Sequence, residues 1–143
     1  MIKVAFDTSP MQDGNRNRGM GVYARNLLIA LKKDPGLLFI EFSQQSSPPR
    51  ADLVHYPYFE LYQHNLPINQ SIPTVVTVPD ITPLLFSEHY PPGLKGRWNL
   101  WLQNWALKNA KQIITLSESS KKDIIEHLSV SADRVTDIHL APA

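Results

Sequence analysis

The sequence has no cysteine, and this absence excludes disulfide bonds, thiolate-ligated metal sites and thiol catalysis. It has no excess of charge of either sign, with 14 basic and 13 acidic residues, so no overall field is available to attract a nucleic acid. No apolar run approaches the roughly 20 residues of a membrane-spanning helix. The apolar run at the N-terminus is too short for a signal peptide. We therefore expect a cytoplasmic protein with no nucleic-acid partner.

Hydrophobic residues make up 43% of the 143 residues, enough to bury the core of one domain spanning residues 1–143. Short apolar runs alternate with helical patterns. Strands are predicted at 2–7, 37–42, 52–56, 73–78, 112–116 and 134–140, and helices at 22–33, at 93–110 and from 117 onward, with a short helix or turn within 81–90. This alternation predicts an α/β, Rossmann-like fold: a doubly wound, mostly parallel sheet of about five or six strands with helices on both faces.

The connection between the second and third predicted strands is unusually short. Residues 43–51 are polar and too few to contain a crossover helix. We therefore expect strand 37–42 at an edge of the sheet, joined to the next strand by an extended crossing. The strand residues expected in the core are Val4, Phe6, Val54, Val75, Val78, Ile114 and Leu116.

Unusual residues follow the predicted strands, where the loops of a parallel sheet gather and ligands bind. Gly19 and Gly21 open a helix, and such a turn would let the backbone approach an anion closely. The alternative is a flexible loop with a glycine-rich helix start. Asp80 follows strand 73–78, where its carboxylate would either contact a substrate hydroxyl or accept hydrogen bonds from nearby backbone amides.

Aromatic and hydroxyl side chains occupy the other strand ends. Tyr56 and Tyr58 belong to a cluster that would either stack on a sugar or cover the edge of the sheet. Ser117 and Ser119 open a helix, so their hydroxyls would contact a ligand or cap the helix. His55 is interpreted as a hydrogen-bonded structural residue. The histidines show no spacing typical of metal ligands, so no metal site is predicted.

The predicted helix 93–110 contains all three tryptophans of the chain. At about 100° per residue they share one face with two leucines, and basic residues flank that face. Packing of this face on the sheet is the expected arrangement, because a parallel sheet needs helices to cover it. The alternative is contact with a membrane surface. The face consists of Leu94, Trp98, Trp101, Leu102 and Trp105, and the flanking residues are Lys95, Arg97, Lys108 and Lys111.

Several motifs occur in a particular order along nearly the whole chain. Asp7 and Pro10 come first, then Gly19, Gly21 and Tyr23 in a G-x-G-x-Y pattern, then DLVHYPYF at 52–59, PTVVTVPDITPLLF at 73–86 and IITLSESSKKDI at 113–124. This order resembles the N-terminal domain of family 4 glycosyltransferases with the GT-B fold, a group that includes bacterial mannosyl- and rhamnosyltransferases.

The resemblance implies one half of a two-domain enzyme. The missing C-terminal domain would bind the nucleotide sugar, and this chain would form the acceptor side. The implied reaction is retaining transfer of a hexose to a glycan or lipid-linked acceptor in polysaccharide biosynthesis, with no metal or other cofactor. Asp80 would be catalytic, and the donor and acceptor would contact Gly19, Gly21, Tyr23, Tyr56, Tyr58, Ser117 and Ser119. The exposed cleft face could also pair two copies of the chain, and the acceptor could bring the enzyme to the inner face of a membrane.

One departure from the family pattern supports an alternative. Family members often have His-Asp after the fourth strand, whereas here Pro79 precedes Asp80. A non-catalytic Rossmann-like binding or regulatory domain that has lost the chemistry would also fit this sequence.

Overall fold

The computed structural model describes residues 1–12, 14, 16–44 and 46–142. Six strands form one sheet in the order β2-β1-β3-β4-β5-β6, and all neighbouring pairs are parallel. Their bounds are Ile2–Asp7 (β1), Leu37–Phe42 (β2), Leu53–Tyr56 (β3), Thr74–Thr77 (β4), Gln112–Thr115 (β5) and Val135–Asp137 (β6). The predicted doubly wound, parallel α/β fold is confirmed.

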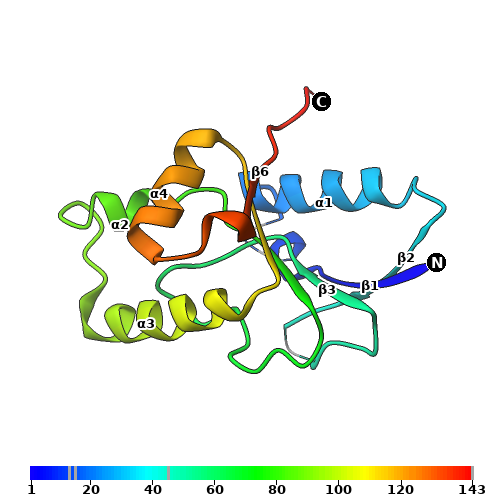
Figure 1. Ribbon diagram of the computed structural model, residues 1–143, viewed down its shortest axis with the longest axis horizontal. Coiled ribbons are helices and arrows are strands. Elements are labelled where there is room, and N and C mark those ends of the chain that lie inside the picture. The colour runs from blue at the N-terminus through cyan, green and yellow to red at the C-terminus, as the bar shows by residue number, and fades with distance from the viewer. Residues whose placement is uncertain (13, 15, 45, 143) are drawn as a thin grey trace.

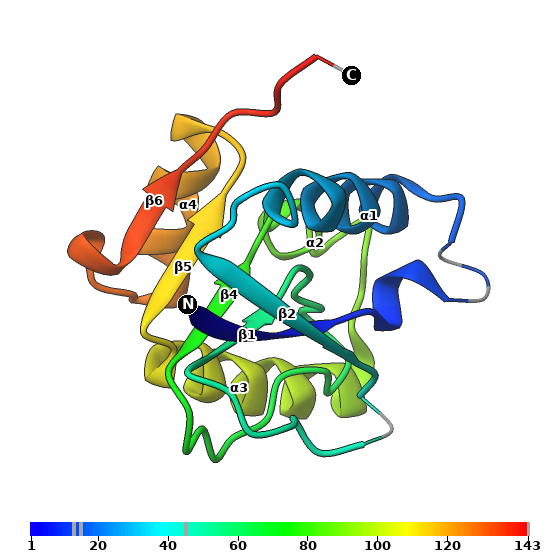
Figure 2. The same ribbon diagram turned by 90° about the vertical axis from the view of Figure 1, so that its right-hand side faces the viewer.

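Helices cover both faces of this sheet. α1 (Gly19–Leu31) lies along one side and α3 (Gly93–Asn109) along the opposite side (Figures 1 and 2). The short α2 (Thr82–Leu85) precedes α3, and α4 (Glu118–Leu128) joins β5 to β6. The described residues also include the 3₁₀ turns η1 (Ser9–Met11) and η3 (Ala132–Arg134).

The β2 strand lies at one edge of the sheet, as its short connection predicted. The chain returns from β2 to β3 without a helix, and the backbone amide of Asp52 donates a hydrogen bond to the carbonyl of Lys3 as the chain reaches β3. Because no helix crosses beneath β2, Leu38 remains 43% exposed.

The core lies mainly between the sheet and the α3–α4 side. Four of the strand residues expected to be in the core are buried: Val54 and Val78 belong to this cluster, whereas Val4 and Phe6 lie on the α1 face, where Phe6 packs against His55. The other three are different. Val75, Ile114 and Leu116 were also expected in the core, but they are only half-buried. Val75 and Ile114 point to the α1 face, as does Thr77, which lies next to Tyr23 of α1. Since α1 connects β1 to β2, it covers that half of the sheet and leaves this face of β4 and β5 partly open.

The expectation that the tryptophan face of α3 packs on the sheet is wrong. Trp98, Trp101 and Trp105 are 61%, 59% and 51% exposed. The helix instead buries Gly96, Gln103, Ala106 and Leu107, followed by Ala110 just after it. These are mostly small side chains, and at Gly96 an added Cβ would lie 3.6 Å from the Cβ of Tyr62, in the loop beneath the helix. Close approach of α3 through this small-residue side leaves the tryptophans on the side facing away from the core.

Candidate functional site

The carboxyl ends of the strands lie at one edge of the sheet, and the direction of winding reverses between β1 and β3. From β1 the chain passes through α1 to β2 on one side, and the later strands are added on the other side. In open parallel sheets a ligand crevice forms outside such a reversal point. Every predicted site residue lies at this edge. Three of them are in the first two turns of α1: Gly19, Gly21 and Tyr23. The others are at the end of β3 or follow β3, β4 and β5 along the chain: Tyr56, Tyr58, Asp80, Ser117 and Ser119.

Asp7, the last residue of β1, is held inside the domain. Its carboxylate accepts hydrogen bonds from the backbone N of Ser9 (2.9 Å), the hydroxyl of Ser9 (2.6 Å) and the side-chain amide of Gln44 (2.9 Å). Only 1% of Asp7 is exposed, and burial raises its pKa despite these hydrogen bonds. Asp7 therefore fixes the turn after β1 and ties it to the loop after β2.

The first turn of α1 begins at an exposed glycine. No side chain of the described residues caps it, so its amide groups remain available as donors. Gly19 is exposed, and an added Cβ would meet no described atom within 4 Å, whereas Gly21 is buried. Amide donors at a helix start suit an anionic group. A hollow of about 460 Å³ beside η1 and α1 is lined by Met11, Gln12, Arg16 and Arg25.

Tyr23 reaches from α1 to the carboxyl end of β4. Its hydroxyl lies 3.5 Å from the hydroxyl of Thr77, which in turn lies 3.2 Å from Nε2 of His55. The ring of Phe6 packs edge-on against that of His55, with centroids 5.2 Å apart. Burial raises the pKa of Tyr23 and lowers the pKa of His55 to about 4, so both are uncharged at neutral pH. Tyr23, a predicted ligand contact, thus makes a hydrogen bond within the domain.

His55 should make the domain less stable on acidification. Its pKa is about 4 in the folded domain and 6.5 as the ordinary value of an exposed histidine, so the unfolded chain binds more protons between these values. Its contribution is fully present above pH 6.5 and is lost as the pH falls through this window, by up to about 3 kcal/mol. Asp7 acts in the opposite direction because its pKa is raised.

The measurement is urea unfolding across that pH range for the native chain and for His55→Gln. The native chain should lose more stability than the variant as the pH falls. Because Asp7 is present in both, parallel pH profiles would contradict the assignment to His55.

Tyr58, Glu60 and Asp80 are polar residues that follow the carboxyl ends of β3 and β4. The hydroxyl of Tyr58 donates to the carboxylate of Glu60. Burial, this hydrogen bond and the charges of Glu60 and Asp80 all raise the pKa of Tyr58. Asp80 is exposed, and its Oδ1 accepts a hydrogen bond of 2.9 Å from the backbone N of Thr82. Its Oδ2 has no hydrogen bond to any residue that the structure describes, so it is free to accept one from a hydroxyl.

Two other residues predicted to contact a ligand, Tyr56 and Ser117, make contacts within the domain. The ring of Tyr56 is 3% exposed and packs against Phe42, and burial together with the charge of Asp7 raises the pKa of Tyr56 to about 12. The hydroxyl of Ser117 accepts a hydrogen bond from the backbone N of Ser120 and so caps α4. Ser119 is exposed in the first turn of that helix.

Comparison with known families gives one match. The family model described as Glycosyltransferase Family 4 matches residues 36–141, about three quarters of the chain. The chain belongs to glycosyltransferase family 4. A search of curated proteins found no match. The matched segment of this family 4 domain includes Tyr58, Asp80 and Ser117 and begins after α1. Gly19 and Gly21 therefore remain candidates on their geometry alone.

Some residues of this family 4 domain that shape the site were not singled out from the sequence. Glu60 and Thr77 make the hydrogen bonds of Tyr58 and Tyr23, and Arg16 and Arg25 line the hollow beside α1. Thr77 lies one residue before the end of the predicted strand 73–78, and this position alone could have indicated it. The loop residues carry no comparable signal, because their neighbours are set by how the loops fold back on the sheet.

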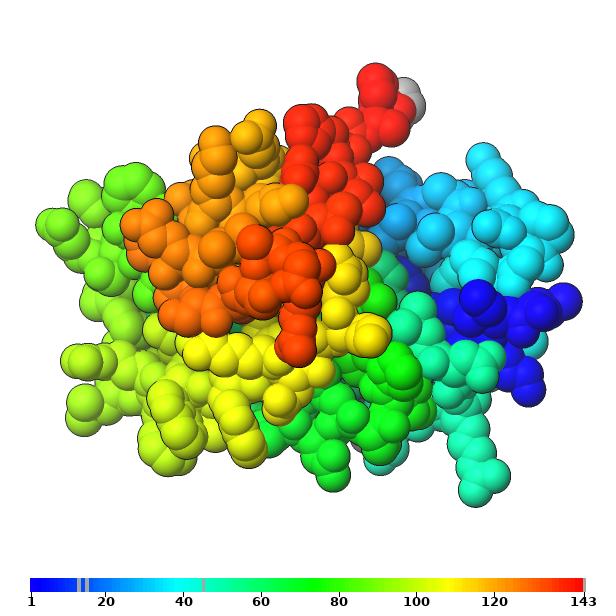
Figure 3. Space-filling view, in the orientation of Figure 1, coloured from blue at the N-terminus to red at the C-terminus, as the bar shows by residue number. Residues whose placement is uncertain are grey.

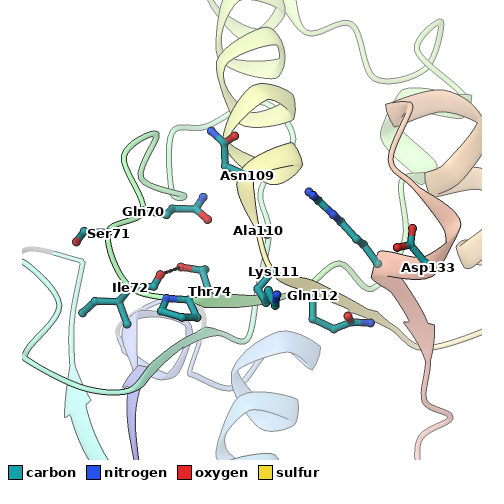
Figure 4. A pocket seen from close by; sticks show the side chains of 11 residues that line it. Gln70, Ser71, Ile72, Thr74, Asn109, Ala110, Lys111, Gln112 and Asp133 are labelled. Atoms are coloured by element: carbon teal, nitrogen blue, oxygen red, sulfur yellow. Dashed lines mark hydrogen bonds between the residues drawn. The ribbon is translucent and has the colours of Figure 1, made fainter.

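A larger hollow, of about 670 Å³, lies at the opposite edge, at the amino ends of the strands. Figure 4 shows Gln70, Thr74, Lys111 and Asp133 around it. None of the predicted site residues lines it. Within the described residues, no three histidine or acidic side chains lie close enough together to bind a metal ion.

Proposed function

We propose that this family 4 domain is the acceptor side of a glycosyltransferase that moves a hexose from a nucleotide sugar to a glycan or lipid-linked acceptor in polysaccharide biosynthesis, with retention of configuration. The observation that carries the proposal is the group of Tyr58, Glu60 and Asp80 at the carboxyl edge of the family-matched sheet. The proposal places the reaction in the cytoplasm, where nucleotide sugars are made.

The acceptor hydroxyl would bind at Asp80. Its free Oδ2 would accept the hydrogen bond of that hydroxyl, while Oδ1 stays in the turn before α2. The half-buried ring of Tyr58 offers an apolar face for a sugar ring, and its hydroxyl is already turned to Glu60. Ser119 is a second exposed hydroxyl on the same edge.

The donor would approach the start of α1. Gly19 leaves the backbone uncovered there, and the free amides together with Arg16 favour a phosphate group. A helix start at an exposed site contributes only about 0.3–1 kcal/mol. Firm binding of the donor therefore requires a further, nucleotide-sugar-binding domain.

The acceptor half of the proposal is tested by NMR of the isotope-labelled chain titrated with neutral oligosaccharides. Amide shifts should concentrate at residues 58–60 and 80–82. Tyr58→Ala should abolish these shifts. The control is Tyr90→Ala, which changes a 52% exposed tyrosine outside the candidate site and should leave the shifts unchanged. Shifts confined to other edges of the sheet would contradict the placement of the acceptor.

The chain of 143 residues alone should not transfer sugar. Holding donor and acceptor at reacting distance supplies about 7–11 kcal/mol of catalysis, and this domain holds only one of them firmly. Calorimetry with a panel of nucleotide sugars should give binding of about millimolar affinity or weaker, and radiolabelled donors should yield no product. Micromolar binding, or transfer by the chain alone, would contradict the need for a second domain.

A second candidate is a non-catalytic binding domain, which Pro79 favours because the family resemblance places a histidine there. The same oligosaccharide shifts would be expected in that case. Absence of transfer after a nucleotide-sugar-binding domain of this family is joined to the chain would favour this candidate.

A further inference from the structure

The outward side of α3 carries a continuous apolar ridge. Leu94, Trp98, Trp101 and Trp105 are 87%, 61%, 59% and 51% exposed, and we call these four residues the tryptophan ridge. At about 100° per residue their mean direction is opposite to that of the buried Gln103. Trp98 and Trp101 stack, with centroids 5.3 Å apart. In Figure 3 the yellow-green and yellow side chains of α3 stand out from the lower edge of the molecule.

The ridge lies in a segment with charge of one sign. Between Glu88 and Glu118 the chain has no acidic residue, although the protein as a whole is almost neutral. The segment contains four basic residues, all exposed, and none of them forms an ion pair with any residue that the structure describes. They are Lys95, Arg97, Lys108 and Lys111. Helical geometry places Arg97 and Lys108 along one flank of the ridge and Lys95 along the other.

We propose that this helix docks the domain on an anionic lipid bilayer. Tryptophan favours the bilayer interface, where its ring is buried and its N–H stays hydrated, and basic side chains beside it are attracted to anionic headgroups. The four side chains are exposed along most of the length of α3, so they can enter the headgroup layer together. Among the described residues no helix combines the length and apolarity needed to cross a membrane, so the contact is with the surface.

Charge argues for lipid over a second copy of the chain. Pairing of two ridges would bring the basic flanks of both copies together without an acidic residue from either helix to neutralise them. An anionic surface meets no such repulsion. The membrane contact is independent of the proposed reaction, since no residue of the ridge belongs to the candidate site.

The test uses the intrinsic fluorescence of the protein. All three tryptophans of the chain lie on the ridge, so their emission reports this surface alone. Vesicles of phosphatidylcholine and phosphatidylglycerol in equal parts should shift the emission to the blue and carry the protein in flotation. Vesicles of phosphatidylcholine alone should bind at least tenfold more weakly, because each basic side chain at an anionic surface contributes about fivefold.

Two sets of variants separate the contributions of the ridge and the charges. Trp98→Ser with Trp101→Ser should weaken binding at least tenfold, with Trp105 as the remaining reporter and an unchanged melting temperature. Arg97→Gln and Lys108→Gln should each weaken it about fivefold. The matched controls are Ile29→Ser, a change of an exposed apolar residue on α1, and Lys33→Gln at the end of α1, and both should bind like the native chain.

Three outcomes would overturn the proposal. The first is equal binding to neutral and anionic vesicles. The second is binding that survives the double tryptophan variant. The third is a concentration-dependent dimer in sedimentation equilibrium that this variant abolishes, together with no binding to vesicles, which would make the ridge a contact between copies.

Discussion

Asp80→Asn should lower sugar transfer about 30- to 150-fold in the glycosyltransferase that contains this domain. The change keeps the size of the side chain and an oxygen at Oδ1, so the hydrogen bond from the backbone N of Thr82 and the turn into α2 should persist. What is lost is a charged acceptor for the substrate hydroxyl. A hydrogen bond to a charged group is worth about 1.5–3 kcal/mol, and the upper part of this range, about 2–3 kcal/mol, corresponds to this change in rate.

The measurement is the release of nucleoside diphosphate from a panel of nucleotide sugars in the presence of glycan or lipid-extract acceptors. Asp123→Asn, a change of a half-buried carboxylate of α4 outside the candidate site, is the matched control and should react at the native rate. Thermal unfolding should be the same for both variants. If Asp80→Asn retained native turnover, the carboxylate would serve only the turn, and the acceptor would have to be oriented elsewhere.

Gln103→Leu should destabilise the domain by about 3–5 kcal/mol. The side chain of Gln103 is fully buried, and its oxygen accepts hydrogen bonds from the backbone N of Asn65 (3.1 Å) and of Leu66 (2.9 Å). Its amide donates to the carbonyl of Leu66 (3.1 Å). Leucine is similar in size but leaves these backbone groups without partners, and each buried unsatisfied group costs about 1–3 kcal/mol. The loss is smaller than the full sum because the loop of Asn65 and Leu66 can move and let water bond to some of these groups.

The loop held by Gln103 also carries Tyr58 and Glu60, because Asn65 bonds to the backbone of both. Amide exchange across residues 58–66 should therefore accelerate in Gln103→Leu, in addition to the fall in the free energy of unfolding measured with urea. Gln112→Leu is the control, since the amide of Gln112 bonds to Thr136 near the surface. It should change the stability by less than about 1 kcal/mol. Equal losses in the two variants would contradict the special role of Gln103.

The sequence predicted most of the fold because strands and helices differ in hydrophobic period. Strand 37–42 has the same bounds in the structure, and helix 93–110 differs by one residue at its end. The period locates an apolar face of a helix but does not say whether that face points inward. On α3 the inward direction is set by Gly96 and Gln103. The side of the helix that carries them packs closely on Tyr62, and Gln103 bonds to the backbone of Leu66.

The candidate site could be predicted only in part. The rule that loops gather at the carboxyl edge predicts that Tyr58 and Asp80 lie at the same edge of the sheet, and in the structure they follow the neighbouring strands β3 and β4. It could not show that Ser117 caps α4 or that Tyr56 is buried, because these depend on where each side chain turns after its strand. Which of these residues bind substrate remains a prediction.

The two borders of the sheet differ in their risk of intermolecular strand pairing. β6 has only three residues, whereas β2 has six, LLFIEF, with one edge open and Leu38 exposed. A six-residue apolar strand with a free edge is a template for amyloid-like aggregation. Its one charge is Glu41, which pairs with Lys32 of the turn after α1. The charge of Glu41 therefore opposes pairing of β2 with another chain. Replacing Glu41 by an uncharged residue would be expected to lower the solubility of the protein without changing its fold.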